Sequence, residues 1–224
     1  MNDDEAMLVE TVRQFVDKEV KPTVREREHA NEYPEAWIEQ MKRIGIYGLA
    51  IGEEYGGAPV SMPCYVLVTQ ELARGWMSLA GAMGGHTVVA KLLTLFGTEE
   101  QKQQYLPPMA SGELRATMAL TEPGGGSDLQ NMSTTAVRDG DDLVINGSKT
   151  WISNARRSGL LKFVRTASRR LIEWRRTSQR RTDNLAGLDW RSPTFLRTTC
   201  RRKKRSSRRF RPPWSTPWGS TRTT

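Results

Sequence analysis

Two short stretches of this 224-residue chain combine residue types that could hold a ligand. The first is LTEPGGGSD at residues 120–128, and the second, about twenty residues further on, is NGSKTWISNA at residues 146–155. The glycines at 124–126 leave backbone N–H groups free to approach an anion closely, and Ser127 adds a hydroxyl donor beside them. The first stretch therefore has the composition of a phosphate cradle.

The side chains around this cradle suit a planar heterocycle. Thr121 follows a β-type run, where its hydroxyl can reach a ring heteroatom, and Trp151 offers a flat apolar face with a polar edge. Ser153 lies two residues beyond Trp151, so the two side chains share a face if this segment is a strand. A lone glycine triplet is more often a simple hairpin loop, and a lone Trp is more often a core residue. The combination carries the interpretation.

Other reactive side chains are weaker candidates. His29 and His86 have no partner acid or nucleophile near them in the sequence, and single histidines of this kind are more often surface or packing residues. Cys64 lies in an apolar run, which favours a buried small hydrophobe over a reactive thiol. Cys200 flanks a basic cluster and could react only if that segment folds. Two cysteines without metal-ligand spacing predict a reducing compartment, no disulfide framework and no metal site.

A helical region precedes the two stretches. Apolar residues recur at three- and four-residue steps over residues 7–24, which predicts an amphipathic helix ending near Pro22. A second helix is expected after Pro34 and ends at Gly45, and the glycine-rich residues 48–60 are typical of a turn or loop. Further helices are expected at residues 62–75 and 77–96, and from a capping box that starts at Thr98.

From about residue 114 the pattern changes to short β-type runs. These runs are β-branched or alternating, and the DGDD and NG sequences between them are typical of hairpin turns. The expected fold class is α+β multidomain, with an all-α helical domain at 1–113 and part of a β-barrel domain at 114–157. The expected strands are Thr117 to Leu120, Ser133 to Arg138, Leu143 to Ile145 and Lys149 to Ile152, with turns at 139–142 and 146–147.

Charge divides the chain near residue 156. Residues 1–155 carry 13 Lys and Arg against 22 Asp and Glu, a net −9, whereas residues 156–224 carry 21 against 3, a net +18. We expect residues 158–224 to form a basic tail without a fold. One interpretation is a nucleic-acid- or membrane-binding arm, RRKKRSSRRFR at 201–211, on a helical scaffold. The interpretation we favour is an out-of-frame product, because shifted reading of GC-rich DNA yields Arg, Pro, Trp, Ser and Thr without periodicity.

The sequence gives no signal for a membrane span or for export. No run approaches the roughly 18 consecutive apolar residues that a spanning helix needs. The first residues, MNDDEAM, are acidic where a targeting segment would be basic. We therefore expect a cytoplasmic location.

Four motifs occur together in the order and at the spacing seen in acyl-CoA dehydrogenases. The chain resembles that family over residues 8–157. The resemblance implies FAD as cofactor, an acyl-CoA thioester as substrate, an electron-transfer flavoprotein as partner and a homo-oligomer in intact relatives. The motifs are EEYGG at 53–57, FGTEEQKQQYLPPMASGE at 96–113, LTEPGGGSD at 120–128 and NGSKTWISNA at 146–155.

The resemblance also implies roles for residues in and just before the first ligand-type stretch. Met118, Leu120 and Thr121 would line the isoalloxazine ring, with the Thr121 hydroxyl bonding a ring heteroatom. Met118 stands where relatives often have an aromatic residue. Ser127 would contact the diphosphate region of FAD and lie near the acyl-CoA.

In the second stretch, Trp151 and Ser153 would pack on the flavin and hydrogen-bond near its N5. The implied reaction is α,β-desaturation, in which a carboxylate base removes the α proton while a hydride passes from the β carbon to flavin N5. The resemblance puts that Glu base in a C-terminal helical domain. Glu173 is the one Glu after residue 155, and its context, LIEWRR, matches nothing in the family. We therefore assign no catalytic residue and expect an inactive fragment without the C-terminal helical domain.

Overall fold

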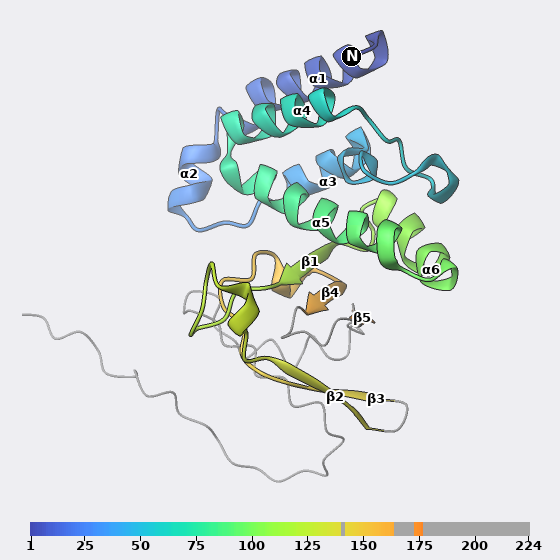
Figure 1. Cartoon of the computed structure of the whole chain (residues 1–224). Coiled ribbons are helices and arrows are strands. Elements are labelled where there is room, and N and C mark those ends of the chain that lie inside the picture. The colour runs from blue at the N-terminus through green and yellow to red at the C-terminus, as the bar shows by residue number, and fades with distance from the viewer. Residues whose placement is uncertain (140–141, 164–172, 177–224) are drawn as a thin grey trace, which may run out of the picture.

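A layer of helices precedes a small β region in the computed structural model, which describes residues 1–139, 142–163 and 173–176 (Figure 1). The basic segment 201–211, and with it both interpretations of the tail, lies outside the described residues. The helices are α1 Asp3–Phe15, α2 Val24–His29, α3 Glu35–Ile44, α4 Met62–Gly75, α5 Met77–Phe96 and α6 Glu99–Ala110.

Local signals place most of the helix ends. α3 follows Pro34 and ends at Gly45, which takes the left-handed conformation with φ 86°. The capping box at Thr98 is complete, since its hydroxyl accepts from the Gln101 N–H and the Gln101 side chain accepts from the Thr98 N–H. The predictions for 62–75 and 77–96 are confirmed by α4 and α5.

The first helix differs from its predicted range. α1 already starts at Asp3, because Asn2 and Glu5 form a capping box ahead of the first apolar turn. It then continues into a π-helical turn over Val16–Val20 instead of regular α-helix to residue 24. The buried side chains of both parts, among them Val12 and Val16, face the core.

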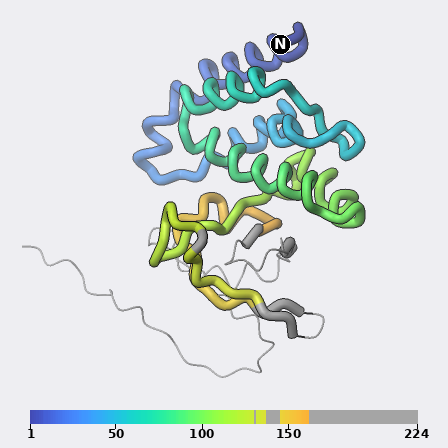
Figure 2. Tube along the Cα trace, viewed as in Figure 1, coloured from blue at the N-terminus to red at the C-terminus, as the bar shows by residue number. Residues whose placement is uncertain are grey.

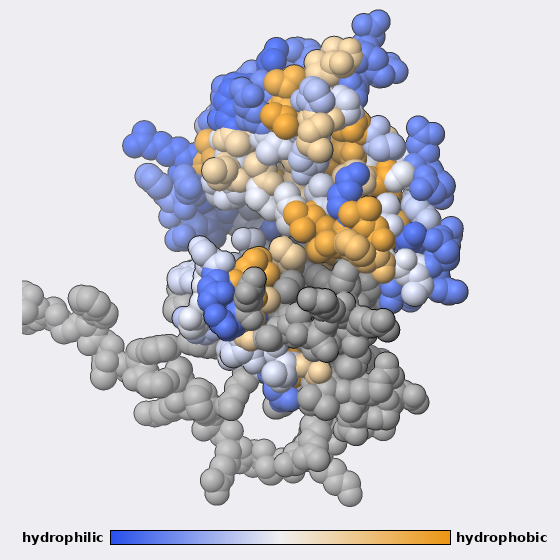
Figure 3. Space-filling model, in the orientation of Figure 1, coloured by the Kyte–Doolittle hydropathy of each residue, from blue (hydrophilic) through white to orange (hydrophobic). Residues whose placement is uncertain are grey.

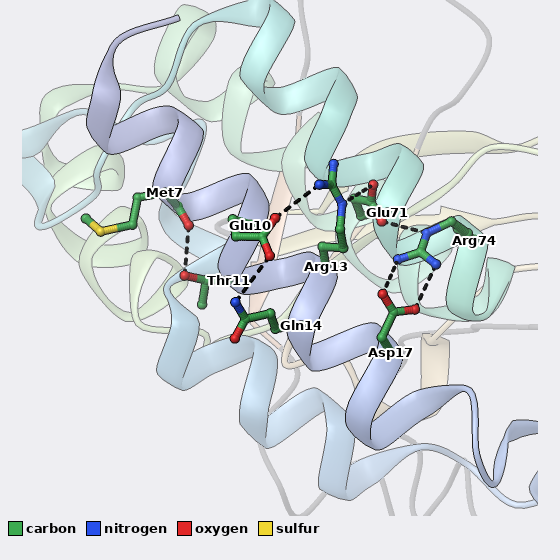
Figure 4. Close-up of polar contacts among 8 residues, drawn as sticks. All are labelled: Met7, Glu10, Thr11, Arg13, Gln14, Asp17, Glu71 and Arg74. Atoms are coloured by element: carbon green, nitrogen blue, oxygen red, sulfur yellow. Dashed lines mark hydrogen bonds and ion pairs between the residues drawn. The ribbon is translucent and has the colours of Figure 1, made fainter.

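An apolar seam joins α1 to α4. Charged side chains border it, since Arg74 donates to both Asp17 carboxylate oxygens at 2.8 and 3.1 Å, and Glu71 accepts from Arg13 and Arg74 (Figure 4). Exposed ion pairs contribute little to stability, whereas a close-packed seam contributes most of it. The buried side chains of the seam include Val9, Val12, Val16, Val20, Cys64, Val68 and Leu72.

The central helix of this layer is α5, which contacts α4, α6 and strand β1. Its length and composition alone would suffice to cross a membrane, a test that core helices of soluble proteins also pass. Leu79, Met83 and Leu93 are fully buried, while apolar side chains near its C-terminus are exposed on the face shown in Figure 3.

The EEYGG motif forms a tight turn after α3. Two 3₁₀ helices, Ile46–Gly48 and Glu53–Tyr55, lie within or beside the predicted loop. Gly56 takes a left-handed conformation with φ 76°, and a Cβ on Gly57 would lie only 2.8 Å from the Ile51 Cβ and closer still to its carbonyl. Both glycines are therefore required by the backbone itself.

Two small sheets follow the helices. Strand β1, Ala116–Ala119, pairs in parallel with β4, Leu160–Phe163, which pairs antiparallel with β5, Glu173–Arg176. The predicted hairpin is confirmed, because β2, Thr135–Asp139, pairs antiparallel with β3, Asp142–Asn146. The Cα trace shows the chain leaving β1, forming this hairpin and returning beside β1 (Figure 2).

Three expectations about the β region differ from the structure. Residues 149–152 do not form a strand, because Trp151 takes a left-handed conformation with φ 57°. The NG at 146–147 is not a hairpin turn, since β3 ends there and the next strand begins only at Leu160. Leu160 is buried in the core between the two layers, although we expected no fold beyond residue 157.

His86 connects the helical layer to the β region. Its Nδ1 accepts a hydrogen bond from the Ala116 N–H at 3.2 Å, where β1 begins, and its ring meets Tyr47 edge-on at 5.0 Å. Nε2 is buried and has no hydrogen-bond partner among the described residues. Burial lowers the pKa of His86 to about 4, so the ring is neutral. His86 is thus a packing residue of the core.

We predict that Gly57→Ala lowers the free energy of unfolding by about 2–3 kcal/mol, because the new Cβ forces the turn away from Ile51. The matched control is Gly84→Ala in α5, where a Cβ meets nothing within 4 Å. This control should gain about 0.5–1 kcal/mol from helix propensity. Urea unfolding followed by circular dichroism measures both, and equal stability of the two variants would contradict the turn geometry.

His86 should also make stability depend on pH. Because its pKa is 6.5 when unfolded and about 4 when folded, its contribution is complete above pH 6.5 and falls as pH drops to 4. The loss amounts to about 3 kcal/mol. His86→Gln keeps an acceptor for Ala116 but does not titrate, so its stability should fall less than that of the original protein over this range. Parallel pH profiles from urea unfolding of the two proteins would contradict the assignment.

Candidate functional site

The two ligand-type stretches lie side by side. The Thr150 N–H donates to the Thr121 carbonyl at 2.9 Å, and the Thr117 hydroxyl donates to the Ser153 carbonyl at 2.7 Å. Ala116, Thr117 and Ala119 of β1 are buried. Met118, Leu120 and Thr121 are half-buried, and Met118 packs against the apolar cluster that contains Ala116 and Leu160.

A buried ion pair organises the start of the glycine-rich loop. The Glu122 carboxylate accepts from the Lys149 Nζ at 2.9 Å, and the two side chains are only 4% and 1% exposed. Both the N–H and the hydroxyl of Ser133 donate to it at 2.6 Å, and Thr134 donates in the same two ways. The Lys149 Nζ also donates to the Leu120 carbonyl at 2.8 Å.

The surroundings of Glu122 keep it charged. Burial raises the pKa of its carboxyl, but the hydrogen bonds from Lys149, Ser133 and Thr134 outweigh this and hold the pKa well below the ordinary range. A carboxylate bound in this way is a structural anchor and is unsuited to taking a proton from a ligand. Sequence analysis missed this pair, since 27 residues separate its members and no local pattern connects them.

Neither the backbone conformation nor the neighbouring described residues require glycine at residues 124–126. Gly124, Gly125 and Gly126 are exposed, and the one turn bond here runs from the Gly125 N–H to the Glu122 carbonyl at 3.2 Å. A Cβ on Gly124 or Gly126 would meet nothing within 4 Å, and neither residue has a positive φ. Open space beside a backbone that needs no glycine favours a loop shaped for a ligand, and Ser127 is exposed in the same loop.

Trp151 is a surface residue. Its side chain is 72% exposed, which rules out a core role. The prediction that Trp151 and Ser153 share one face of a strand is wrong, because left-handed turns at Trp151 and Asn154 replace the expected strand. Both side chains are nevertheless exposed beside the end of β1.

The arrangement therefore suits binding better than proton transfer. Five of the six predicted residues lie on the two adjacent segments, and the sixth, Ser127, lies in the exposed loop between them. An exposed indole, a threonine hydroxyl and a glycine-lined loop fit a planar ring attached to a phosphate group. Of the reactive residues considered above, His86 is buried between layers, and Cys64 is buried with a thiol pKa raised by burial.

The sequence matches two consecutive domains of one family. Residues 2–113 match the acyl-CoA dehydrogenase N-terminal domain, and residues 117–178 match the acyl-CoA dehydrogenase middle domain. The second match covers both ligand-type stretches and extends beyond residue 157.

Individual proteins give the same result. The chain is 35% identical over 185 residues to (2S)-methylsuccinyl-CoA dehydrogenase of Cereibacter sphaeroides, covering 82% of this chain and 34% of that protein. It is 37% identical to a short-chain specific acyl-CoA dehydrogenase of Clostridium acetobutylicum, covering 67% of this chain and 40% of that protein. Its structure resembles that of a glutaryl-CoA dehydrogenase from Mycobacterium smegmatis in complex with FADH2, with a TM-score of 0.68 and 31% identity over 73% of this chain and 42% of that one.

We predict strong coupling between Glu122 and Lys149. Removing one member leaves the other charge buried, so Glu122→Gln and Lys149→Met should each lower the free energy of unfolding by about 3–5 kcal/mol. The double variant should lose much less than the sum of the two, because it leaves no uncompensated charge. Urea unfolding of all four proteins measures the coupling energy.

The pair formed by Glu99 and Lys102, 2.7 Å apart, provides the matched control, because the Glu99 side chain is 70% exposed. The same two changes there should show a coupling of at most about 0.5 kcal/mol, because solvent screens the exposed Glu99 carboxylate. Additive losses at Glu122 and Lys149 would mean that the pair is not formed as described.

Proposed function

Because the chain belongs to the acyl-CoA dehydrogenase family, we propose that its two adjacent ligand-type segments form the flavin-facing part of an FAD site. The observation that carries this proposal is the pairing of residues 117–121 with 150–153, which sets an exposed Trp151 beside the end of β1. The open space beside Gly124 and Gly126, where the backbone does not require glycine, supports a ligand in the same region.

In the proposed site each residue has a distinct contact. Met118, Leu120 and Thr121 present their half-buried side chains to the isoalloxazine ring, and the Thr121 hydroxyl donates to it. Trp151 packs on the ring and Ser153 bonds at its edge. The exposed Ser127, in the glycine-rich loop, contacts the diphosphate region and lies near an acyl-CoA thioester.

The proposed activity of the family fold is α,β-desaturation of an acyl-CoA, with an electron-transfer flavoprotein as the electron acceptor. FAD supplies the hydride acceptor when it is bound. The residues described here hold and orient the ring, and none of them is assigned as the base that removes the α proton. The chain spans 34% and 40% of the length of the two relatives above. Because none of the described residues is assigned as the base, we propose that these residues bind FAD without turning over an acyl-CoA.

FAD titration tests the proposal. We expect the full chain to quench flavin fluorescence, and Trp151→Ala to weaken binding about tenfold, which corresponds to about 1.4 kcal/mol and is within the range of aromatic stacking. Because the Trp151 ring is exposed, the melting temperature should not change. The control is Phe96→Ala, another exposed aromatic residue, at the end of α5, which should leave FAD binding unchanged.

Two results would contradict parts of this proposal. Absence of FAD binding by the full chain would contradict the flavin site itself. Loss of the visible flavin absorbance on adding butyryl-CoA without oxygen would contradict the proposed lack of turnover, because the flavin would then have been reduced.

A further inference from the structure

The segment that carries Trp151 is held in an unfavourable backbone conformation. Trp151 and Asn154 have φ values of 57° and 60°, and neither is glycine. The left-handed region is strained for residues with a side chain, although Asn tolerates it better than most. Such a conformation persists only where contacts from elsewhere in the fold determine it.

One of those contacts comes from the helical layer. The Tyr33 hydroxyl, just ahead of α3, donates to the Asn154 Oδ1 at 2.9 Å across 121 residues of sequence. Burial raises the pKa of Tyr33, so the hydroxyl keeps the proton that it donates. A second contact, from the Thr117 hydroxyl to the Ser153 carbonyl, fixes the same segment to β1.

Tyr33 is itself held from two sides. Arg115 donates to the Tyr33 hydroxyl at 3.1 Å, and the Arg157 guanidinium lies over the Tyr33 ring, 3.7 Å from its centroid. Glu35 accepts from both arginines, at 3.3 Å from Arg115 and 2.6 Å from Arg157. We call these four residues the Tyr33 cluster; Tyr33 and Glu35 lie at the start of α3, Arg115 directly precedes β1, and Arg157 lies in the turn before β4.

We propose that the Tyr33 cluster consists of positioning residues that hold residues 151–154 in the conformation that presents Trp151 to the flavin. The inference rests on the proposed flavin site for its ligand and on the contacts above for its geometry. A segment that is already ordered loses less conformational freedom when a ligand binds, so the cluster should raise ligand affinity without touching the ligand.

Tyr33→Phe tests the cluster. The variant keeps the ring beneath Arg157 but removes the hydroxyl that bonds Asn154. In the full chain we expect hydrogen exchange to become about fivefold faster in a peptide covering residues 150–157, whose Thr150, Ala155 and Arg157 amides are hydrogen-bonded. Exchange in α4 should not change. FAD should bind about fivefold more weakly.

Two further variants separate positioning from general destabilisation. Tyr105→Phe removes the hydroxyl of another partly buried tyrosine, in α6, and should change neither quantity. Asn154→Asp keeps an oxygen acceptor for Tyr33 at a residue type that tolerates positive φ, and should retain the exchange protection of residues 150–157.

The outcomes divide cleanly. Unchanged exchange at residues 150–157 in Tyr33→Phe, or faster exchange throughout the chain, would overturn the positioning role. If the original protein binds no FAD but Tyr33→Phe loosens residues 150–157 alone, the proposed flavin site fails while the structural control of this segment by the cluster stands.

Discussion

The β region is organised around one buried ion pair. A carboxylate and an ammonium group are stable inside a protein only when they are close and fully hydrogen-bonded, and Glu122 and Lys149 meet this condition. The pair joins three pieces of chain: the start of the glycine-rich loop, the residues leading into β2, and the residue two positions before Trp151. A different path of the loop would leave one charge alone. The cost of that alternative selects the observed arrangement.

The helical layer supplies what this small β region lacks. Strands of four or five residues bury little apolar surface, so β1 depends on its contacts with α5 and on the hydrogen bond between His86 and Ala116. The Tyr33 hydroxyl extends the same support to the segment after Lys149. His86 and Tyr33, which sequence patterns assign to the helical domain, therefore both support the β region.

Sequence patterns predicted the helices well because their signals are local. Apolar spacing and small end residues such as Gly45 act within a few positions, and the fold leaves those preferences unopposed. Residues 149–152 have β-branched and aromatic side chains and so favoured a strand, but contacts with Thr117 and Thr121 override that preference. β4 was missed because it has four residues between arginine-rich segments, and its partner β1 lies more than 40 residues earlier.

The candidate site follows the same division between local and distant signals. Five of the six residues chosen by resemblance lie in two continuous motifs, Met118 lies two residues before the first, and the structure brings those motifs together. Glu122 and Lys149 lie within these motifs, but their pairing across 27 residues follows no local pattern, and neither does the contact of Tyr33 with Asn154 across 121 residues. The flavin-binding roles of the six residues chosen by resemblance remain predictions.

The exposure of Trp151 gives this division a physical meaning. An indole that is 72% exposed leaves a large apolar surface in water, and a left-handed backbone at the same residue adds strain. Packing within the described residues offsets neither the exposed apolar surface nor the backbone strain, since Trp151 is not part of their core. A planar ligand stacked on the ring would cover that surface and recover the first cost without any change of the backbone. The conformation is therefore better explained by a site that is formed before its ligand arrives than by one that the ligand induces.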